Sequence, residues 1–160
     1  MPRLGNPLVY DLLEVARGLA GQTGRPNLRK AAMRRAVSSA YYAVFHALCF
    51  ICASELVGWG RTGLLEPIYR LLDHATVRKR LTGREAAAMV PEILEIGARF
   101  AELQEARHLA DYSPPALEVH RSEILGLIAA AERIVALIEG LVPDDRARMA
   151  VLLIAKPRQT

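Results

Sequence analysis

The chain has 160 residues, and its composition limits the classes of protein to which it can belong. Hydrophobic residues make up 52% of it, which excludes an intrinsically disordered chain. Aromatic residues reach only 6%, and the abundance of alanine, leucine and arginine favours helices over a β-sandwich or barrel. The net charge of +4 permits a nucleic-acid partner without requiring one. A chain of this length is expected to form one domain, over residues 1–160.

The cysteines and the N-terminal segment bear on the cellular compartment. Cys49 and Cys52 lie in an apolar run, and no further cysteine is present to complete a zinc site or a disulfide framework, so both are expected in the core of a protein from a reducing compartment. The N-terminus lacks the apolar core of a signal peptide. The longest mostly apolar stretch, residues 40–53, is shorter than the ~20 residues that a membrane span needs. We therefore expect a cytoplasmic protein that does not interact with a membrane.

Two helices are predicted in the first part of the chain. Asn6 followed by Pro7 is typical of an N-cap and a first helical position, and Gly21 marks the end of this first helix. The second helix is the longest, over residues 28–57, and contains no glycine or proline until Gly58 ends it.

The remainder of the chain predicts shorter and longer helices in alternation. Residues 61–83 are less regular, with Pro67 starting a short helix and residues 73–76 breaking it. Further helices are predicted over residues 91–111, 117–141 and 144–155, the last being a short C-terminal helix. The expected fold class is all-α: a mostly antiparallel, up-down helical bundle with four main helices plus short extra helices.

The longest predicted helix carries a polar stripe. Arg35, Ser39, Tyr42 and His46 are spaced by four, three and four residues, which places them along one face. The opposite stripe is apolar and contains Val37, Tyr41, Val44, Leu48 and Ile51. The polar stripe is therefore expected to face solvent, a groove between helices or a partner chain.

A second polar cluster ends the predicted helix at 91–111. Arg107 and Asp111 form one i, i+4 pair, and His108 and Tyr112 form another. If the two clusters meet, one interpretation is a hydrogen-bonded network that holds antiparallel helices in register. The other interpretation is a site that binds a ligand.

Other polar residues lack a specific pattern. His74 and His120 have no metal ligands at useful spacing, and surface or capping positions are expected for them. The sequence contains no glycine-rich phosphate loop, so neither a cofactor nor a metal is expected. Two basic runs are interpreted as solvated faces or as phosphate-binding surfaces. They contain Arg25, Arg29, Lys30, Arg34 and Arg35, and Arg78, Lys79, Arg80 and Arg84.

Three segments resemble small bacterial proteins of the HEPN superfamily. These segments are residues 34–48, with the string Ser-Ser-x-Tyr-Tyr-x-x-Phe-His, residues 69–74, and residues 103–114, with an arginine followed by Ala-Asp-Tyr. The resemblance implies an all-α bundle that is usually a homodimer. Many members are RNA-cleaving toxins or RNA-binding modules, and many are paired with a minimal nucleotidyltransferase. It also implies that the helices carrying the two clusters lie side by side. An Arg107–Asp111 ion pair would then face Ser39, Tyr42 and His46.

The ribonucleases of this superfamily carry an arginine and a histidine separated by four to six residues. Here His108 follows Arg107 directly, and Tyr112 stands where a four-residue gap would place the histidine. Arg70 and His74 are separated by only three residues. We therefore expect a non-catalytic module that binds nucleic acid or a partner protein, within a toxin–antitoxin or defence system.

The alternative function is a metal-independent ribonuclease with a diverged site. In that hypothesis Arg107 would bind the phosphate, and His108 or His46 would titrate near neutrality. Adjacent residues on a helix diverge by about 100°, however, so the Arg107 and His108 side chains point in different directions unless a second subunit rearranges the site.

Overall fold

The computed structural model describes residues 3–156, and within that range the chain forms eight α-helices and no β-strand. The helices are α1 (Pro7–Ala20), α2 (Pro26–Leu56), α3 (Thr62–Tyr69), α4 (His74–Leu81), α5 (Arg84–Ala87), α6 (Pro91–Tyr112), α7 (Arg121–Gly140) and α8 (Pro143–Ile154). The predicted all-α fold class is confirmed.

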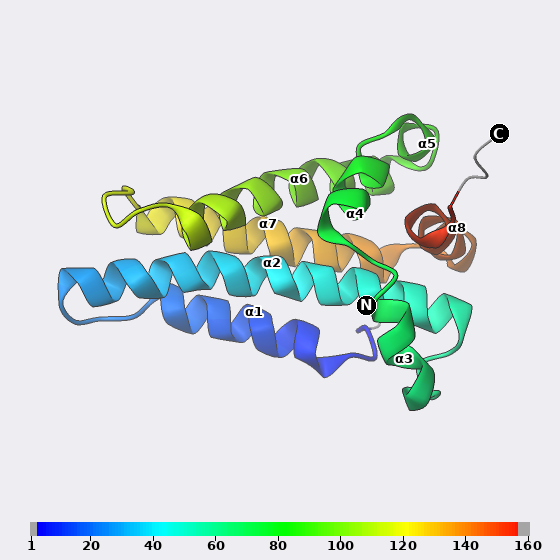
Figure 1. Cartoon of the computed structure of the whole chain (residues 1–160), viewed down its shortest axis with the longest axis horizontal. Coiled ribbons are helices and arrows are strands. Elements are labelled where there is room, and N and C mark those ends of the chain that lie inside the picture. The colour runs from blue at the N-terminus through cyan, green and yellow to red at the C-terminus, as the bar shows by residue number, and fades with distance from the viewer. Residues whose placement is uncertain (1–2, 157–160) are drawn as a thin grey trace.

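The long helices α1, α2, α6 and α7 lie along the long axis of the molecule, and their chain directions alternate (Figure 1). The shorter helices α3, α4, α5 and α8 gather around one end of these four (Figure 1). Helix α2 contacts α1, α3, α6, α7 and α8, so it is the centre of a packed helical bundle.

Burial of α2 explains its composition. Among the described residues, α2 is the helix with the length and apolar composition of a membrane span, and 78% of its most apolar stretch is buried by the rest of the protein. Cys49 and Cys52 are fully buried on it, as expected for core residues. A long apolar helix of this kind occurs both as a membrane span and as the buried core helix of a soluble protein. The expected cytoplasmic location therefore stays a prediction.

Several helix boundaries follow the local signals in the sequence. Asn6 caps α1 by accepting a hydrogen bond from the backbone N–H of Leu8 at 3.1 Å, and Pro7 is the first helical residue. Proline also occupies the first position of α2, α6 and α8. Helix α2 therefore begins two residues before the predicted start.

The segment between α2 and α6 differs from the prediction. Residues 73–76 do not break a helix; instead, Asp73 accepts a hydrogen bond from the Thr76 N–H at 2.8 Å and caps the start of α4. Pro67 lies inside α3 rather than at its start. Helix α5 was not anticipated, and α7 begins at Arg121 instead of residue 117, because the residues after the two prolines form an irregular connection.

Arginine side chains close the carbonyl ends of several helices. Each donates to backbone oxygens that have no partner within their own helix, where the helix dipole also favours a positive charge. Arg34 donates to the Ala110 oxygen of α6 at 2.5 Å, Arg80 to the Leu152 oxygen of α8 at 2.8 Å and Arg121 to the Ala20 oxygen of α1 at 2.9 Å. The basic runs are thus partly structural, and not simply solvated.

Close packing fixes the position of α4 against α6. Gly97 of α6 is buried, and a Cβ atom there would lie 2.8 Å from the carbonyl carbon of Leu81 at the end of α4. No side chain larger than hydrogen fits at this contact. Helix α8 is held by burial of Met149, Leu152 and Leu153. Most of its apolar side chains are therefore buried within the chain.

Candidate functional site

The predicted ion pair between Arg107 and Asp111 is present on α6, with 3.7 Å between the guanidinium and the carboxylate. The two side chains are only 13% and 14% exposed, so the pair lies largely inside the protein. On the α2 side, Ser38 donates its hydroxyl hydrogen to Asp111 at 3.2 Å. Arg35 lies 3.5 Å from the same carboxylate and is 67% exposed. Arg35 is therefore the cation of this cluster that reaches solvent.

Two tyrosines of α2 lie beneath the guanidinium of Arg107. Its central carbon is 5.0 Å from the ring centre of Tyr41 and 5.8 Å from that of Tyr42. Both distances allow attraction between the cation and the electron-rich ring faces. Arg107 thus bridges α6 to α2 through aromatic rings as well as through Asp111.

A histidine from α4 completes the cluster. Tyr41 Oη lies 2.6 Å from Nδ1 of His74, and the His74 ring stacks on Phe45 with 4.1 Å between ring centres. The expectation that His74 occupies a surface or capping position is wrong. The helix that Asp73 starts brings this imidazole, partly buried, onto α2.

Gln104 contacts both partners of the hydrogen bond between Tyr41 and His74. Its amide nitrogen donates to the His74 carbonyl oxygen at 2.8 Å and lies 3.4 Å from the Tyr41 hydroxyl, to which it also donates. Because the Tyr41 oxygen accepts from Gln104, we assign the hydroxyl proton of Tyr41 to the bond with Nδ1 of His74. In this arrangement the neutral imidazole carries its proton on Nε2, where it is a hydrogen-bond donor.

Burial governs the protonation of this cluster. Burial and then the nearby Arg107 cation lower the pKa of His74, while the adjacent Asp73 opposes the change. Burial raises the pKa of Tyr41, although Gln104 and Arg107 oppose that shift. His74 is therefore neutral and Tyr41 protonated at neutral pH.

The remaining predicted site residues are distributed over other places. Ser39 is partly buried next to Ser38, but Ser38 is the serine that contacts Asp111. His46 lies one turn after Tyr42 along α2, and its ring centre is 5.8 Å from that of Tyr69. Burial lowers the pKa of His46. His108 and Tyr112 are exposed on α6, with their ring centres 5.0 Å apart. Of the predicted polar stripe, Arg35 lies beside Asp111 and Tyr42 lies close to Arg107, whereas no hydrogen bond or ion pair among residues 3–156 joins Ser39 or His46 to that pair.

Ser38, Tyr41, His74 and Gln104 belong to the observed cluster, although none of them was predicted as a site residue. Gln104, Arg107 and Asp111 have i, i+3, i+7 spacing, which would have predicted a shared face on α6. Tyr41 was placed with the buried side of α2, and a buried hydroxyl requires a partner. No local signal predicts the position of His74, because it depends on how α4 packs against α6.

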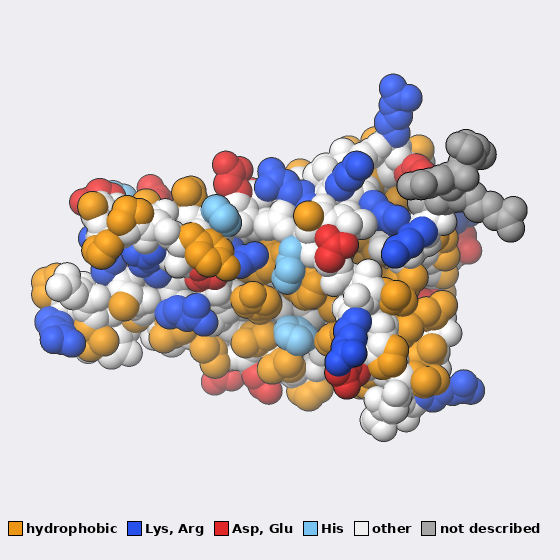
Figure 2. Space-filling model, viewed as in Figure 1, with side chains coloured by type: hydrophobic (Ala, Val, Ile, Leu, Met, Phe, Trp, Pro, Cys, Tyr) orange, Lys and Arg blue, Asp and Glu red, His pale blue; other side chains and the backbone are white. Residues whose placement is uncertain are grey.

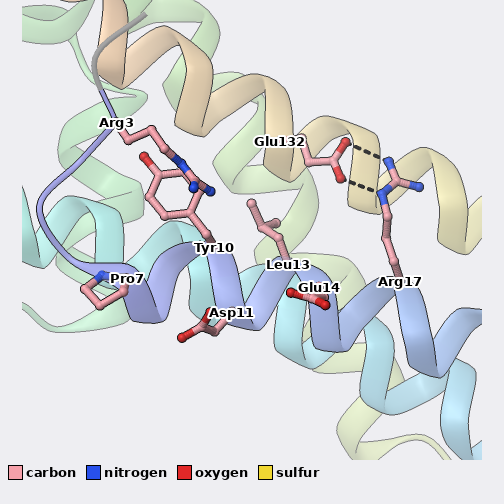
Figure 3. A pocket seen from close by; sticks show the side chains of 8 residues that line it. All are labelled: Arg3, Pro7, Tyr10, Asp11, Leu13, Glu14, Arg17 and Glu132. Atoms are coloured by element: carbon pink, nitrogen blue, oxygen red, sulfur yellow. Dashed lines mark hydrogen bonds and ion pairs between the residues drawn. The ribbon is translucent and has the colours of Figure 1, made fainter.

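A separate pocket of about 500 Å³ lies between the N-terminal segment, α1 and α7 (Figure 3). Arg17 and Glu132 form a two-point ion pair at one end, with distances of 2.6 and 2.7 Å. Arg3 lies over the ring of Tyr10, with 3.8 Å from its guanidinium carbon to the ring centre. Both arginines of this pocket are thus engaged by other side chains, and the Arg17–Glu132 pair joins α1 to α7.

The distribution of charged side chains indicates which kind of ligand the molecule can bind. In Figure 2, Lys and Arg side chains gather over one end of α2 and α6, and again around α4, α5 and α8, with histidines between these regions. Within residues 3–156, no three His, Cys, Asp or Glu side chains form a group that could hold a metal ion. The donors of the α2–α4–α6 cluster are suited to an anion.

Comparisons with protein-family models, with curated proteins and with solved structures find no match to this chain. Its function is therefore argued from the geometry described above.

Proposed function

We propose that this chain is an HEPN-like, non-catalytic module that binds RNA at the cluster between α2, α4 and α6. The three segments that resemble the superfamily lie on α2, at the junction of α3 and α4, and on α6; α6 packs against α2 and α4, and α3 packs against α2. A homodimer, a nucleotidyltransferase partner and a role in a toxin–antitoxin or defence system belong to the same proposal, as expectations from that resemblance.

The observation that carries the proposal is the hydrogen-bond chain from Gln104 through Tyr41 to His74. It leaves the His74 imidazole as a donor at Nε2, close to the charge of Arg107. Arg35 adds a solvent-exposed cation beside the carboxylate of Asp111, which also pairs with Arg107. A phosphate group is recognised by such a combination of cations and N–H donors.

Fluorescence anisotropy with a labelled single-stranded RNA tests the proposal over a range of salt concentrations. Removing one phosphate-contacting cation should reduce the slope of log affinity against log salt by about 0.7. We expect this reduction for Arg35→Ala. Arg133→Ala is the matched control, since Arg133 is 53% exposed on α7 and also lies beside a carboxylate, that of Glu95. Equal binding by the two variants, or no binding at low salt, would contradict the proposal.

A metal-independent ribonuclease is the second candidate, and the position of His74 beside Arg107 favours it. His74, rather than His108, would then supply the titrating group. Incubation of purified protein with RNA in the presence of a chelator should show cleavage that is lost in Arg107→Ala and His74→Ala and kept in His108→Ala. Intact RNA in this assay would leave binding as the function.

The homodimer is tested separately by sedimentation. The chain has a mass of 17.6 kDa, and the proposed dimer has twice that mass. A monomer at micromolar concentration would overturn this part of the proposal without affecting the RNA-binding site.

A further inference from the structure

A groove of about 870 Å³ lies between α4, α5 and α8, away from the cluster described above. Thr76, Lys79 and Arg80 form one wall, with the i, i+3, i+4 spacing of a single face of α4. The opposite wall is α8. Helices of 8 and 12 residues are roughly 12 and 18 Å long, so the walls match two to three turns of a further helix.

Positive charge is concentrated in this groove. Its lining contains five cationic residues and one carboxylate, that of Glu85. The resulting excess of four positive charges equals the net charge of the whole chain, +4. The cations are Lys79, Arg80, Arg84, Arg148 and Lys156. Among the ion pairs found within residues 3–156, only Arg148 of these five takes part, with Asp144 at 3.1 Å.

Arg80 has a structural role within the groove. It donates to the carbonyl oxygens of Leu152 and Ala155 at the end of α8, which ties this wall to α4. Lys79, Arg84 and Lys156 make no ion pair among residues 3–156 and are available for a ligand.

The floor and one edge of the groove are apolar. Val151 is 63% exposed in the groove, whereas Leu152 is buried and Met89 is partly buried. Ala147 and Ala155 flank them on the same face of α8. Small and aliphatic side chains with a basic rim form a surface that accepts an amphipathic helix.

We propose that the groove between α4, α5 and α8 binds an acidic amphipathic helix of a partner protein. The apolar stripe of that helix lies on Val151 and its neighbours, and its Asp and Glu side chains face Lys79, Arg84 and Lys156. Charge complementarity guides the encounter and sets the orientation of the bound helix. This binding site is independent of the proposed RNA site.

Two other occupants fit the groove less well. No aromatic residue is among those that line it, so it lacks the stacking surface that single-stranded nucleic acid uses, and its apolar floor offers nothing to phosphates. A second copy of the chain in a two-fold dimer would place the basic groove against itself, and the like charges would repel.

A synthetic peptide provides the probe. We would use a fluorescein-labelled peptide of about 14 residues, long enough for the walls, with leucine at i, i+3, i+4 and i+7 positions and glutamate elsewhere. A scrambled peptide of the same composition keeps the charge and removes the apolar stripe. The amphipathic peptide should bind at least about tenfold more tightly than its scramble.

Matched variants locate the binding surface. Lys79→Glu and Arg84→Glu should each weaken peptide binding about tenfold, whereas Arg29→Glu, the same charge change at an exposed position of α2, should not. Val151→Glu should abolish the preference for the amphipathic peptide, and Val15→Glu on α1, also an exposed valine, should preserve it. All five positions are exposed, and circular dichroism would verify the helix content of each variant.

Three outcomes would overturn the inference. The first is equal binding of the two peptides, and the second is peptide binding that Lys79→Glu and Arg84→Glu leave unchanged. The third is that these variants abolish RNA binding, or that Val151→Glu converts a dimer to a monomer, since the groove would then bind nucleic acid or a second copy. Failure of the RNA site is detected separately, because Arg35→Ala should not affect the peptide.

Discussion

The hydroxyl of Tyr41 lies 2.6 Å from Nδ1 of His74, and this contact joins the middle of α2 to the first turn of α4. It places a partly buried imidazole beside Arg107, and with the hydroxyl assigned as the donor, the neutral ring carries its proton on Nε2. The candidate site thus depends on a residue from each of three helices.

Removing the Tyr41 hydroxyl should change the titration of His74. The hydroxyl donates to the neutral form of the imidazole, so Tyr41→Phe removes that stabilisation and should raise the pKa of His74 towards its ordinary value. NMR titration of the imidazole protons measures the change. Tyr42→Phe is the control, since the Tyr42 hydroxyl makes no hydrogen bond among residues 3–156. A His74 pKa that does not respond to Tyr41→Phe would contradict the assigned direction of the bond.

The free energy of unfolding should decrease when the pH falls from about 7.5 to about 5.5. Burial lowers the pKa of both His46 and His74, so the unfolded chain binds protons below about pH 6.5 that the folded protein does not bind. Their contribution to stability is complete above that pH and is lost as the pH falls towards the folded-state values. Urea unfolding at several pH values measures the slope, and the His46→Gln/His74→Gln double variant should flatten it. An unchanged slope in that variant would assign the pH dependence to other groups.

Asp111→Asn should destabilise the protein by about 3 kcal/mol, because it leaves the largely buried charge of Arg107 without its counter-ion. Denaturant unfolding measures the loss. Glu66→Gln is the matched control: Glu66 forms an i, i+4 pair with Arg70 at 2.5 Å, but both side chains are about three-quarters exposed. The control should lose less than about 0.5 kcal/mol. A comparably small loss for Asp111→Asn would mean that the cluster is not architectural and would strengthen its assignment to ligand binding.

Gly97→Ala and Gly126→Ala should have opposite effects on stability. Alanine stabilises an exposed helix interior over glycine by about 0.5–1 kcal/mol, and nothing lies within 4 Å of a Cβ atom at position 126 of α7. At position 97 the added methyl group overlaps the backbone of Leu81, so α4 must move away from α6, at a cost of about 3 kcal/mol. Thermal melts compare the two variants. Stabilisation by Gly97→Ala would show that the α4–α6 contact is looser than described.

Local sequence signals determined the helical architecture of this protein. The pairs Asn6–Pro7 and Arg107–Asp111 were both predicted from spacing within a few residues, and both are present. Such predictions succeed because a cap, a proline or an i, i+4 pair acts within one turn of a helix. The prediction that residues 73–76 break a helix was wrong, because Asp73 is the N-cap that starts α4.

Only the tertiary structure decided which side chains share a site. Ser38 and Ser39 are neighbours in the sequence, and a rotation of α2 by about 100° exchanges them, so spacing cannot select the one that reaches Asp111. His74 is brought to Arg107 by the close approach of α4 to α6 at Gly97, and the basic groove exists because α8 packs beside α4. These relationships depend on how whole helices are rotated and packed against one another, which the periodicity of each helix alone does not specify.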